Sequence, residues 1–220
     1  MKITFLGHAC FLIDTGSEKL LTDPYLTGAG VSPISADRVQ ADYILVSHGH
    51  GDHVGDAAAI AKRTGAKLVC TIDLYEHIFA KDKLPVIPGN VGGTAQCGSA
   101  MVKTVSAIHG SGVPGGLATG FLISAGGKTV YFAGDTALTA DMALYKEDGV
   151  DAALLPIGGV FTMDPHDALR AAVMTGAKLV VPMHYNTFPG IRQDASAFAE
   201  ACKGKGFDCA PLQPGQSVEI

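Results

Sequence analysis

The chain has 220 residues, enough for one large domain or for two fused halves that share a core. Its hydrophobic content of 47% and charged content of 17% exclude a disordered chain, and no apolar run is long enough to cross a membrane. The net charge of −5, with no Lys/Arg cluster, disfavours nucleic acid as a partner.

Short apolar runs, many of them rich in β-branched residues, predict ten strands in chain order. These strands are 2–6, 10–14, 19–22, 43–47, 67–70, 101–107, 121–124, 129–133, 152–155 and 179–183. Helices are predicted at 54–63, 72–79, 165–174 and 196–203. Asp164 caps the third helix and Asp194 opens the fourth. The mixture predicts an α/β fold.

Two halves of the chain resemble each other. The run FLIDTGSEKLLTDP from Phe11 resembles FLISAGGKTVYFAGDT from Phe121, and ADYILVSH resembles AKLVVPMH. In each half a hairpin is followed later by an apolar strand that delivers a histidine, His48 or His184. Two such sheets packed face to face predict a four-layer αββα sandwich of two pseudo-duplicated halves, in a single domain over residues 1–220.

The segment SHGHGDH, residues 47–53, lies between a predicted strand and a predicted helix. Three histidines and an aspartate spaced H-x-H-x-D-H on a sharp turn point in two directions and form two adjacent half-sites for metal ions. One turn cannot complete both sites, so further ligands must come from other strand ends. Three candidates stand there: His109, Asp135 and His184.

These motifs, together with GDT at 134–136 and PMH at 182–184, resemble the motif series of the metallo-β-lactamase superfamily over nearly the whole chain. GHACFLID at 7–14, TDP at 22–24, LLPIGGVFTMDP at 154–165 and MHYNTFP at 183–189 further resemble small bacterial and archaeal metal-dependent hydrolases related to the ascorbate-6-phosphate lactonase branch. The resemblance implies two divalent metal ions per chain. It implies that His48, His50 and His109 hold one ion, that Asp52, His53 and His184 hold the other, and that Asp135 bridges them.

Two neighbouring divalent ions can share a water molecule and lower its pKa, so that a bridging hydroxide becomes the nucleophile. Catalytic roles are expected for Asp135, as the bridge, and for Asp52, which would also orient the hydroxide by accepting a hydrogen bond. Nitrogen and oxygen ligands without a thiolate permit Zn, Mn, Fe or Co. Zn is the default expectation, and Mn is what the lactonase relatives suggest.

Four further residues are candidates for contacts with the ligands or the substrate. His8 is either a proton donor or substrate contact in the pocket or a hydrogen-bonded core histidine. Asp23 either fixes a ligand imidazole or forms a turn. Asn186 and Thr187 are expected to present polar groups to the substrate. The glycine-rich segment 110–116 either moves over the cleft or forms plain turns.

The expected reaction is hydrolysis of a small ester, lactone or phosphoester, with a small molecule as the partner. Lactam hydrolysis is disfavoured, because the antibiotic-hydrolysing lactamases generally use a cysteine ligand and lack the bridging aspartate, whereas Asp135 is present here. A phosphodiesterase or ribonuclease is the alternative enzyme. A di-iron redox or metal-sensing module is the alternative from another class.

The five cysteines are scattered and form no CxxC pair, and the first residues do not resemble a signal peptide. This pattern predicts reduced thiols in the cytoplasm. A homo-oligomer is a default expectation for an enzyme of this kind and has no specific sequence signal.

Overall fold

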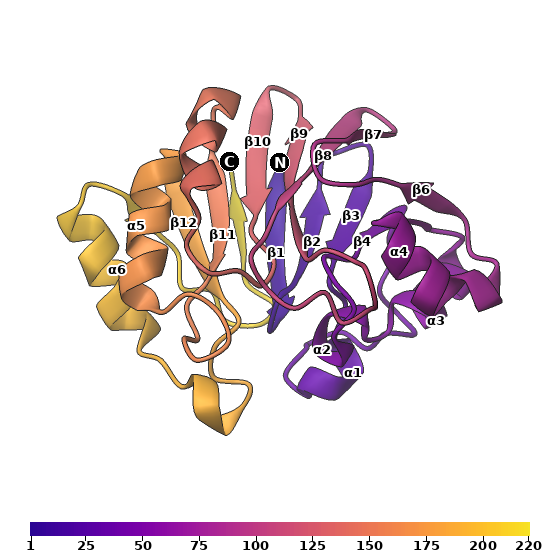
Figure 1. Ribbon diagram of the computed structural model, residues 1–220. Helices are drawn as coiled ribbons and strands as arrows, with labels where there is room; N and C mark the ends of the chain where they lie inside the picture. Colours follow the sequence, from indigo (N-terminus) through magenta and orange to yellow (C-terminus); the bar gives the residue numbers. More distant parts are fainter.

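The computed structural model describes residues 1–220 and contains two seven-stranded sheets packed face to face. Helices α5 (Pro165–Thr175) and α6 (Ala195–Gly204) cover one outer face, and α3 (Ala57–Thr64) and α4 (Ile72–Leu74) cover the other (Figure 1). The predicted α/β class and four-layer sandwich are therefore confirmed. None of the helices combines the length and the hydropathy that a membrane span requires.

The first sheet has the order β14-β1-β2-β3-β4-β5-β6. Its strands are β1 (Lys2–Gly7), β2 (Cys10–Asp14), β3 (Lys19–Thr22), β4 (Tyr43–Leu45), β5 (Lys67–Cys70), β6 (Val86–Pro88) and β14 (Ser217–Glu219). The other helical segments of this half are α1 (Leu26–Ala29), α2 (Gly51–Val54), the π-helix η1 (Tyr75–Phe79) and the 3₁₀ turn η2 (Ala80–Asp82). The two chain termini meet because β14 pairs with β1 (Figure 1).

The second sheet has the order β13-β12-β11-β10-β9-β8-β7. Its strands are β7 (Thr94–Cys97), β8 (Ala100–Ser106), β9 (Thr119–Ala125), β10 (Lys128–Phe132), β11 (Ala152–Pro156), β12 (Leu179–Met183) and β13 (Asp208–Cys209). The 3₁₀ segments η3 (Ala140–Asp148) and η4 (Pro189–Ile191) complete this half. Each sheet changes from antiparallel to parallel pairing, at β3 in the first and at β10 in the second. The shared pairing pattern matches the predicted duplication.

The main core lies between the two sheets, where the apolar runs of both halves meet. Phe11 of the first sheet packs edge-on against Phe132 of the second, with ring centroids 6.4 Å apart, and Phe121 stacks on Phe132 at 6.3 Å. All three rings are fully buried. Burial of such a ring contributes about 1.5–3 kcal/mol of transfer free energy, so this layer holds the halves together.

All ten predicted strands are present, and the caps on the last two helices are confirmed. The Asp164 carboxylate accepts a hydrogen bond from the N–H of Asp167 at 2.8 Å, and Asp194 accepts bonds from two free amides of α6. The predicted helix 54–63 is wrong in one respect, because it is two helices, α2 and α3. Gly55 separates them with φ +39°, and a Cβ there would lie 2.8 Å from the Cα of Tyr25.

The predicted helix 72–79 also changes character, from α to π after Leu74. Four strands had no prediction, and all four, β6, β7, β13 and β14, are edges of the two sheets. Edge strands are short and only partly buried, so they need no continuous apolar run.

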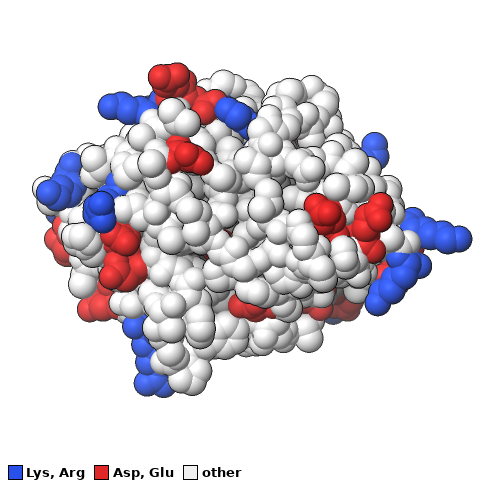
Figure 2. Space-filling view, viewed as in Figure 1, with Lys and Arg blue, Asp and Glu red and all other residues white.

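The Lys and Arg side chains lie toward the margin of the face that Figure 2 shows, and the middle of that face is free of them.

Candidate metal centre

The predicted ligands meet at one end of the sandwich because they follow strands that run in the same direction. His48 comes three residues after β4, and His184 directly after β12. Asp135 follows β10, and His109 follows β8, which runs parallel to β10 two strands away. The carboxyl ends of such strands share one edge of the sheet, which is where open α/β sheets bind ligands.

One group of donors consists of His48, His50 and His109, whose ring nitrogens lie within 4.8 Å of one another. His48 Nε2 is 2.9 Å from His50 Nδ1, and His109 Nε2 is 3.3 Å from the same atom. Three imidazole nitrogens drawn from two segments therefore converge on one point, which is a spacing that a metal ion requires.

A second group contains Asp52, His53 and His184, joined by His8, again with donor atoms within 4.8 Å. Asp52 Oδ2 lies 3.8 Å from the Nε2 atoms of both His53 and His184. These contacts are too long for hydrogen bonds, so the donors face a common space.

Asp135 stands between the two groups. Its Oδ2 is 3.1 Å from His184 Nε2 and 3.3 Å from His53 Nε2, both in the second group. The same oxygen is 3.6 Å from His109 Nε2 in the first group. The structure thus brings all seven predicted ligands into one cluster, with Asp135 in contact with both sides.

Several buried polar atoms of this cluster have no hydrogen-bond partner: His53 Nε2, Asp135 Oδ1 and both ring nitrogens of His184. A buried polar atom without a partner destabilises the fold by about 1–3 kcal/mol. The Nε2 atoms of His53 and His184 both lie within 3.3 Å of Asp135 Oδ2, and nitrogen and oxygen donors that converge in this way fit a divalent cation.

Asp23 is fully buried behind this cluster. Its Oδ2 accepts hydrogen bonds from His53 Nδ1 at 2.7 Å and from Ser47 Oγ at 2.6 Å, while Oδ1 accepts one from the N–H of Ser47 at 2.8 Å. These bonds fix the His53 ring with Nε2 directed at Asp135. The placement agrees with the expectation that Asp23 orients an imidazole.

His8 is 1% exposed, and its ring spans two partners. Nε2 lies 3.2 Å from Asp52 Oδ2, and Nδ1 lies 2.7 Å from Thr187 Oγ1. His8 therefore contacts a candidate ligand directly, and Thr187 reaches the cluster through it. Asn186 does not line the cavity at the cluster, because its side-chain amide bonds both the N–H and the carbonyl of Gln193, at 2.9 and 3.1 Å.

Burial governs the protonation of the first group. It lowers the pKa of His48 to about 2, and it also lowers the pKa of His109. Both rings are therefore neutral near pH 7. Neutral imidazole is the form that donates a lone pair to a metal ion.

In the second group, attraction between opposite charges outweighs burial. Burial alone lowers the pKa of His53 and His184, but the Asp135 carboxylate beside them raises both. Burial alone raises the pKa of Asp52 and Asp135, but the neighbouring imidazoles hold both below their usual range. The carboxylates are ionised, and a metal ion that binds here would displace the protons of His53 and His184.

The glycine-rich segment 110–116 packs against the turn that carries the first group. The N–H of Gly49 donates to the carbonyl of Ser111 at 2.7 Å. Gly112 has φ +73°, and a Cβ there would lie 2.5 Å from the carbonyl carbon of Gly49. Both glycines are needed for this close approach, which gives the segment a packing role next to His50.

A cavity of about 270 Å³ opens onto the cluster and is lined by His50, Asp52, His109, Asp135, Phe161, His184 and Phe188. Phe161 and Phe188 were not predicted as site residues, because aromatic residues in loops follow no periodic pattern.

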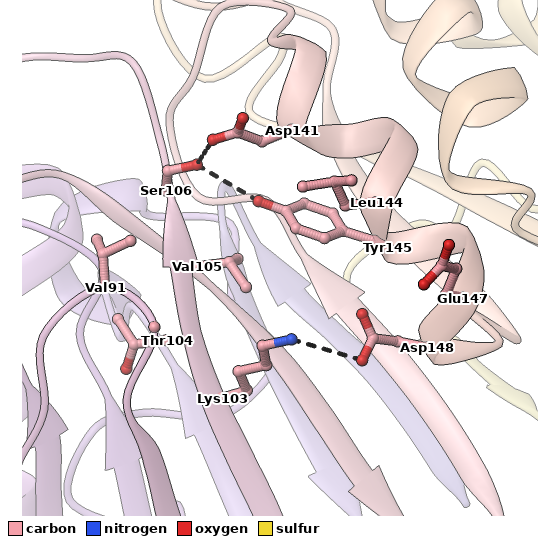
Figure 3. A pocket seen from close by; sticks show the side chains of 11 residues that line it. Val91, Lys103, Thr104, Val105, Ser106, Asp141, Leu144, Tyr145, Glu147 and Asp148 are labelled. Carbon is pink, nitrogen blue, oxygen red and sulfur yellow. Dashed lines mark hydrogen bonds and ion pairs between the residues drawn. The ribbon is translucent and has the colours of Figure 1, made fainter.

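A larger cavity, of about 600 Å³, lies between β8 and η3 (Figure 3). Ser106 Oγ donates to Asp141 at 2.6 Å there, and Lys103 pairs with Asp148 at 3.6 Å. These polar groups bond each other, and none of the seven clustered residues lines this cavity. The smaller cavity is therefore the candidate active site, because it is lined by candidate metal ligands and the larger cavity is not.

Known proteins resemble this chain over its full length. Residues 2–184 match the family described as the beta-lactamase superfamily domain. A UPF0173 metal-dependent hydrolase of Heliobacterium modesticaldum is 45% identical over 233 residues, covering 100% of this chain and 98% of the relative. A UPF0173 metal-dependent hydrolase of Thermus thermophilus is 43% identical over 224 residues, covering 100% and 99%.

Among solved structures, Igni18, a metallo hydrolase from the hyperthermophilic archaeon Ignicoccus hospitalis, superposes with a TM-score of 0.92. It is 34% identical, and the match covers 100% of this chain and 98% of Igni18. These matches confirm the family resemblance that the motifs carried. The chain belongs to the beta-lactamase superfamily and, within it, to the UPF0173 metal-dependent hydrolases.

Proposed function

We propose that the chain is a dinuclear-metal hydrolase that cleaves a small ester, lactone or phosphoester. The observation that carries this proposal is the contact of Asp135 Oδ2 with both donor groups, at 3.1–3.6 Å. In the proposal one ion is held by His48, His50 and His109, the other by Asp52, His53 and His184, and Asp135 is shared. The buried atoms without hydrogen-bond partners support the same assignment.

Two bound divalent ions would supply a water molecule of lowered pKa and would polarise the carbonyl or phosphoryl oxygen of the substrate. The protein would hold and orient the reactants. Asp52 is held by His8 at 3.2 Å and faces the cavity, so its carboxylate would accept a hydrogen bond from the attacking water. In ester hydrolysis the water oxygen bonds to the carbonyl carbon, the bond to the leaving oxygen breaks, and that oxygen takes up a proton.

The donor set narrows the choice of metal. None of the five cysteines belongs to a group that could hold an ion, so coordination would be by nitrogen and oxygen alone. Such a set suits Zn and Mn, and we infer Zn as the first choice and Mn as the second. Binding of iron in place of Zn or Mn would support the alternative function, a di-iron redox or sensing module.

A nucleic-acid substrate fits the cavity less well. No Lys or Arg is among the residues that line it, and the chain carries a net charge of −5. Proteins that bind a phosphate backbone use several cationic side chains. A small-molecule substrate is therefore the better proposal, ahead of a phosphodiesterase or ribonuclease on RNA.

The state of the cysteines indicates the cellular compartment in which the chain works. All five are free thiols, and four are buried. Burial raises the pKa of Cys70 to about 12 and that of Cys97 to about 11, so both thiols are unreactive. We infer a reducing, cytoplasmic environment from this usage.

The test is hydrolysis of a panel that contains a lactone, a carboxylic ester, a phosphomonoester and a phosphodiester, with Zn-loaded and Mn-loaded protein. Asp135→Asn is expected to lower kcat/KM on the preferred class by at least about 100-fold, because the shared ligand is lost. Asp141→Asn, in the larger cavity, is the matched control and keeps the rate. Equal rates for wild type and Asp135→Asn across the panel would end the proposal, and an iron-dependent absorption band without hydrolysis would favour the di-iron module.

A further inference from the structure

One of the large apolar side chains exposed on the surface, Phe161, lines the metal cavity, and another, Ile108, directly precedes the candidate ligand His109. Ten large apolar side chains are exposed in the whole chain, and four of them lie in two loops, the β8–β9 loop that carries His109 and the β11–α5 loop that is hydrogen-bonded to Thr136. These four are Ile108 at 63% exposure, Leu117 at 59%, Val160 at 79% and Phe161 at 60%. Exposed apolar side chains that cluster beside a cavity mark a binding surface.

Both loops are anchored at the residue next to Asp135. Thr136 Oγ1 accepts a hydrogen bond from the N–H of Ile108 at 3.0 Å, and the carbonyl of Thr136 accepts one from the N–H of Met163, also at 3.0 Å. These two bonds hold Ile108 and the end of the β11–α5 loop next to Asp135. Val160 has φ +54°, a conformation that a β-branched residue rarely adopts, so the fold keeps this loop tip in a strained shape.

Two aromatic rings form walls of the cavity itself. Phe161 and Phe188 line the same space as Asp52 and Asp135. Phe188 packs edge-on against His8, with ring centroids 5.3 Å apart, and this contact holds the Phe188 ring in position. When the bond to be hydrolysed lies at the donor cluster, the rest of the substrate lies between these two rings.

The walls contain no side chain of a permanently cationic residue. Neither Lys nor Arg lines the cavity. A substrate with a second negative group, such as a sugar phosphate, would find no cationic partner beyond the metal ions themselves. An uncharged chain would instead cover the exposed apolar side chains.

We propose that the substrate is an uncharged ester or lactone with an apolar chain or ring, which binds between Phe161 and Phe188. This inference rests on the proposed function and narrows it, because it excludes substrates with a charged tail. Each buried methylene is worth up to about fourfold in affinity, so specificity for chain length follows from the geometry.

The test is a series of γ-lactones with alkyl chains of increasing length, next to the same series with a terminal carboxylate. The value of kcat/KM is expected to rise about two- to fourfold per methylene until the chain leaves the cavity, and to fall when the carboxylate is added. Phe161→Ala should flatten the rise. Leu144→Ala removes a side chain of 65% exposure from the larger cavity of Figure 3 and should leave the rise intact.

A binding measurement separates this inference from the hydrolytic function. The corresponding γ-lactams, which resist hydrolysis, would be titrated into metal-loaded protein by calorimetry. Tighter binding with chain length, a negative heat-capacity change and loss of both in Phe161→Ala would support the apolar subsite even if no lactone turned over.

Two results would overturn the subsite. One is hydrolysis of the shortest lactone that depends on Asp135 but shows no gain with chain length, in which case the proposed function stands alone. The other is a change of oligomeric state in Phe161→Ala with no change in lactam binding, which would assign the apolar surface to a second copy of the chain. Because Phe161 is mostly exposed, its replacement removes little core packing, and circular dichroism would verify the fold.

Discussion

The backbone N–H of His184 donates a hydrogen bond to the carbonyl oxygen of His8 at 2.9 Å, and the two imidazole centroids are 4.1 Å apart. His8 follows β1 of the first sheet, and His184 follows β12 of the second. Both residues have φ +55°, an uncommon conformation for residues other than glycine. The two halves of the sandwich are thus joined at the candidate metal centre itself, so the geometry of the centre depends on how the sheets pack.

Asp23 is expected to control the second donor group without touching its cavity. Asp23→Ala removes the acceptor of His53 Nδ1 and of the Ser47 N–H, and leaves the Ser47 hydroxyl with His48 Nδ1, at 3.0 Å, as its one partner. The change should cost about 3 kcal/mol of unfolding free energy and 10- to 100-fold in metal affinity. Competition with a fluorescent chelator measures the affinity. The control is Asp14→Ala, at the end of β2, where only the N–H of Gly16 loses its partner. Equal affinity for the two variants would show that Asp23 does not position His53.

Tyr131→Phe is expected to stabilise the protein. The Tyr131 hydroxyl is fully buried and has no hydrogen-bond partner, while its ring packs against that of Tyr145 with centroids 5.0 Å apart. Removal of the hydroxyl eliminates an unpaired polar group and keeps the ring, so the unfolding free energy should rise by about 1 kcal/mol. Urea denaturation measures it. A loss of stability would mean that the hydroxyl has a partner, such as an ordered water molecule.

Asp151 is expected to make stability depend on pH. Burial alone raises its pKa, but Lys178, with Nζ at 2.8 Å, and the N–H of Thr129, at 3.0 Å, lower it. A carboxyl group whose folded pKa lies below its unfolded value, about 3.9, stabilises the fold above that value. The contribution is lost as the pH falls through the folded pKa.

Asp151→Asn should therefore lower the unfolding free energy at pH 7 by about 1–3 kcal/mol, and the gap to wild type should close below about pH 4. Urea titrations at several pH values measure this gap. A gap of constant size down to pH 3 would show that the charge of Asp151 contributes nothing.

Gly112 and Gly115 form a matched pair. Their φ angles are +73° and +72°, but a Cβ on Gly112 would strike Gly49 whereas one on Gly115 meets open space. Gly115→Ala should cost about 1 kcal/mol from the left-handed backbone alone. Gly112→Ala should cost more and should also weaken metal binding, because the turn that carries His50 must shift. Thermal unfolding and metal affinity measured on both variants test this, and equal losses would contradict the packing role of the segment.

The parts of the fold that the sequence predicted are those where local pattern and tertiary structure agree. The buried strands have continuous apolar runs, and α5 begins with Asp164 and Pro165, so both were visible. The edge strands lack such runs. The break between α2 and α3 could not be seen, because it depends on the contact of Gly55 with Tyr25, thirty residues earlier in the chain.

In the candidate metal centre, too, the residues that belong to local sequence motifs were predicted and those that depend on tertiary contacts were not. The seven proposed ligands come from motifs that have a fixed order, and the structure brings them together. The contact of His8 with Asp52 joins the residue that follows β1 to a residue of α2, and no spacing in the sequence encodes it. Phe161 and Phe188 lie in loops without periodicity, so only the folded chain shows that they line the cavity.

The number of metal ions bound per chain decides whether Asp135 joins two of them. Protein equilibrated with Zn, and separately with Mn, would be dialysed and analysed by mass spectrometry of the metal. We expect two ions per chain for wild type and for Asp141→Asn, and a loss of at least one ion for Asp135→Asn. A wild-type content of one ion, or two ions retained by Asp135→Asn, would contradict the dinuclear centre.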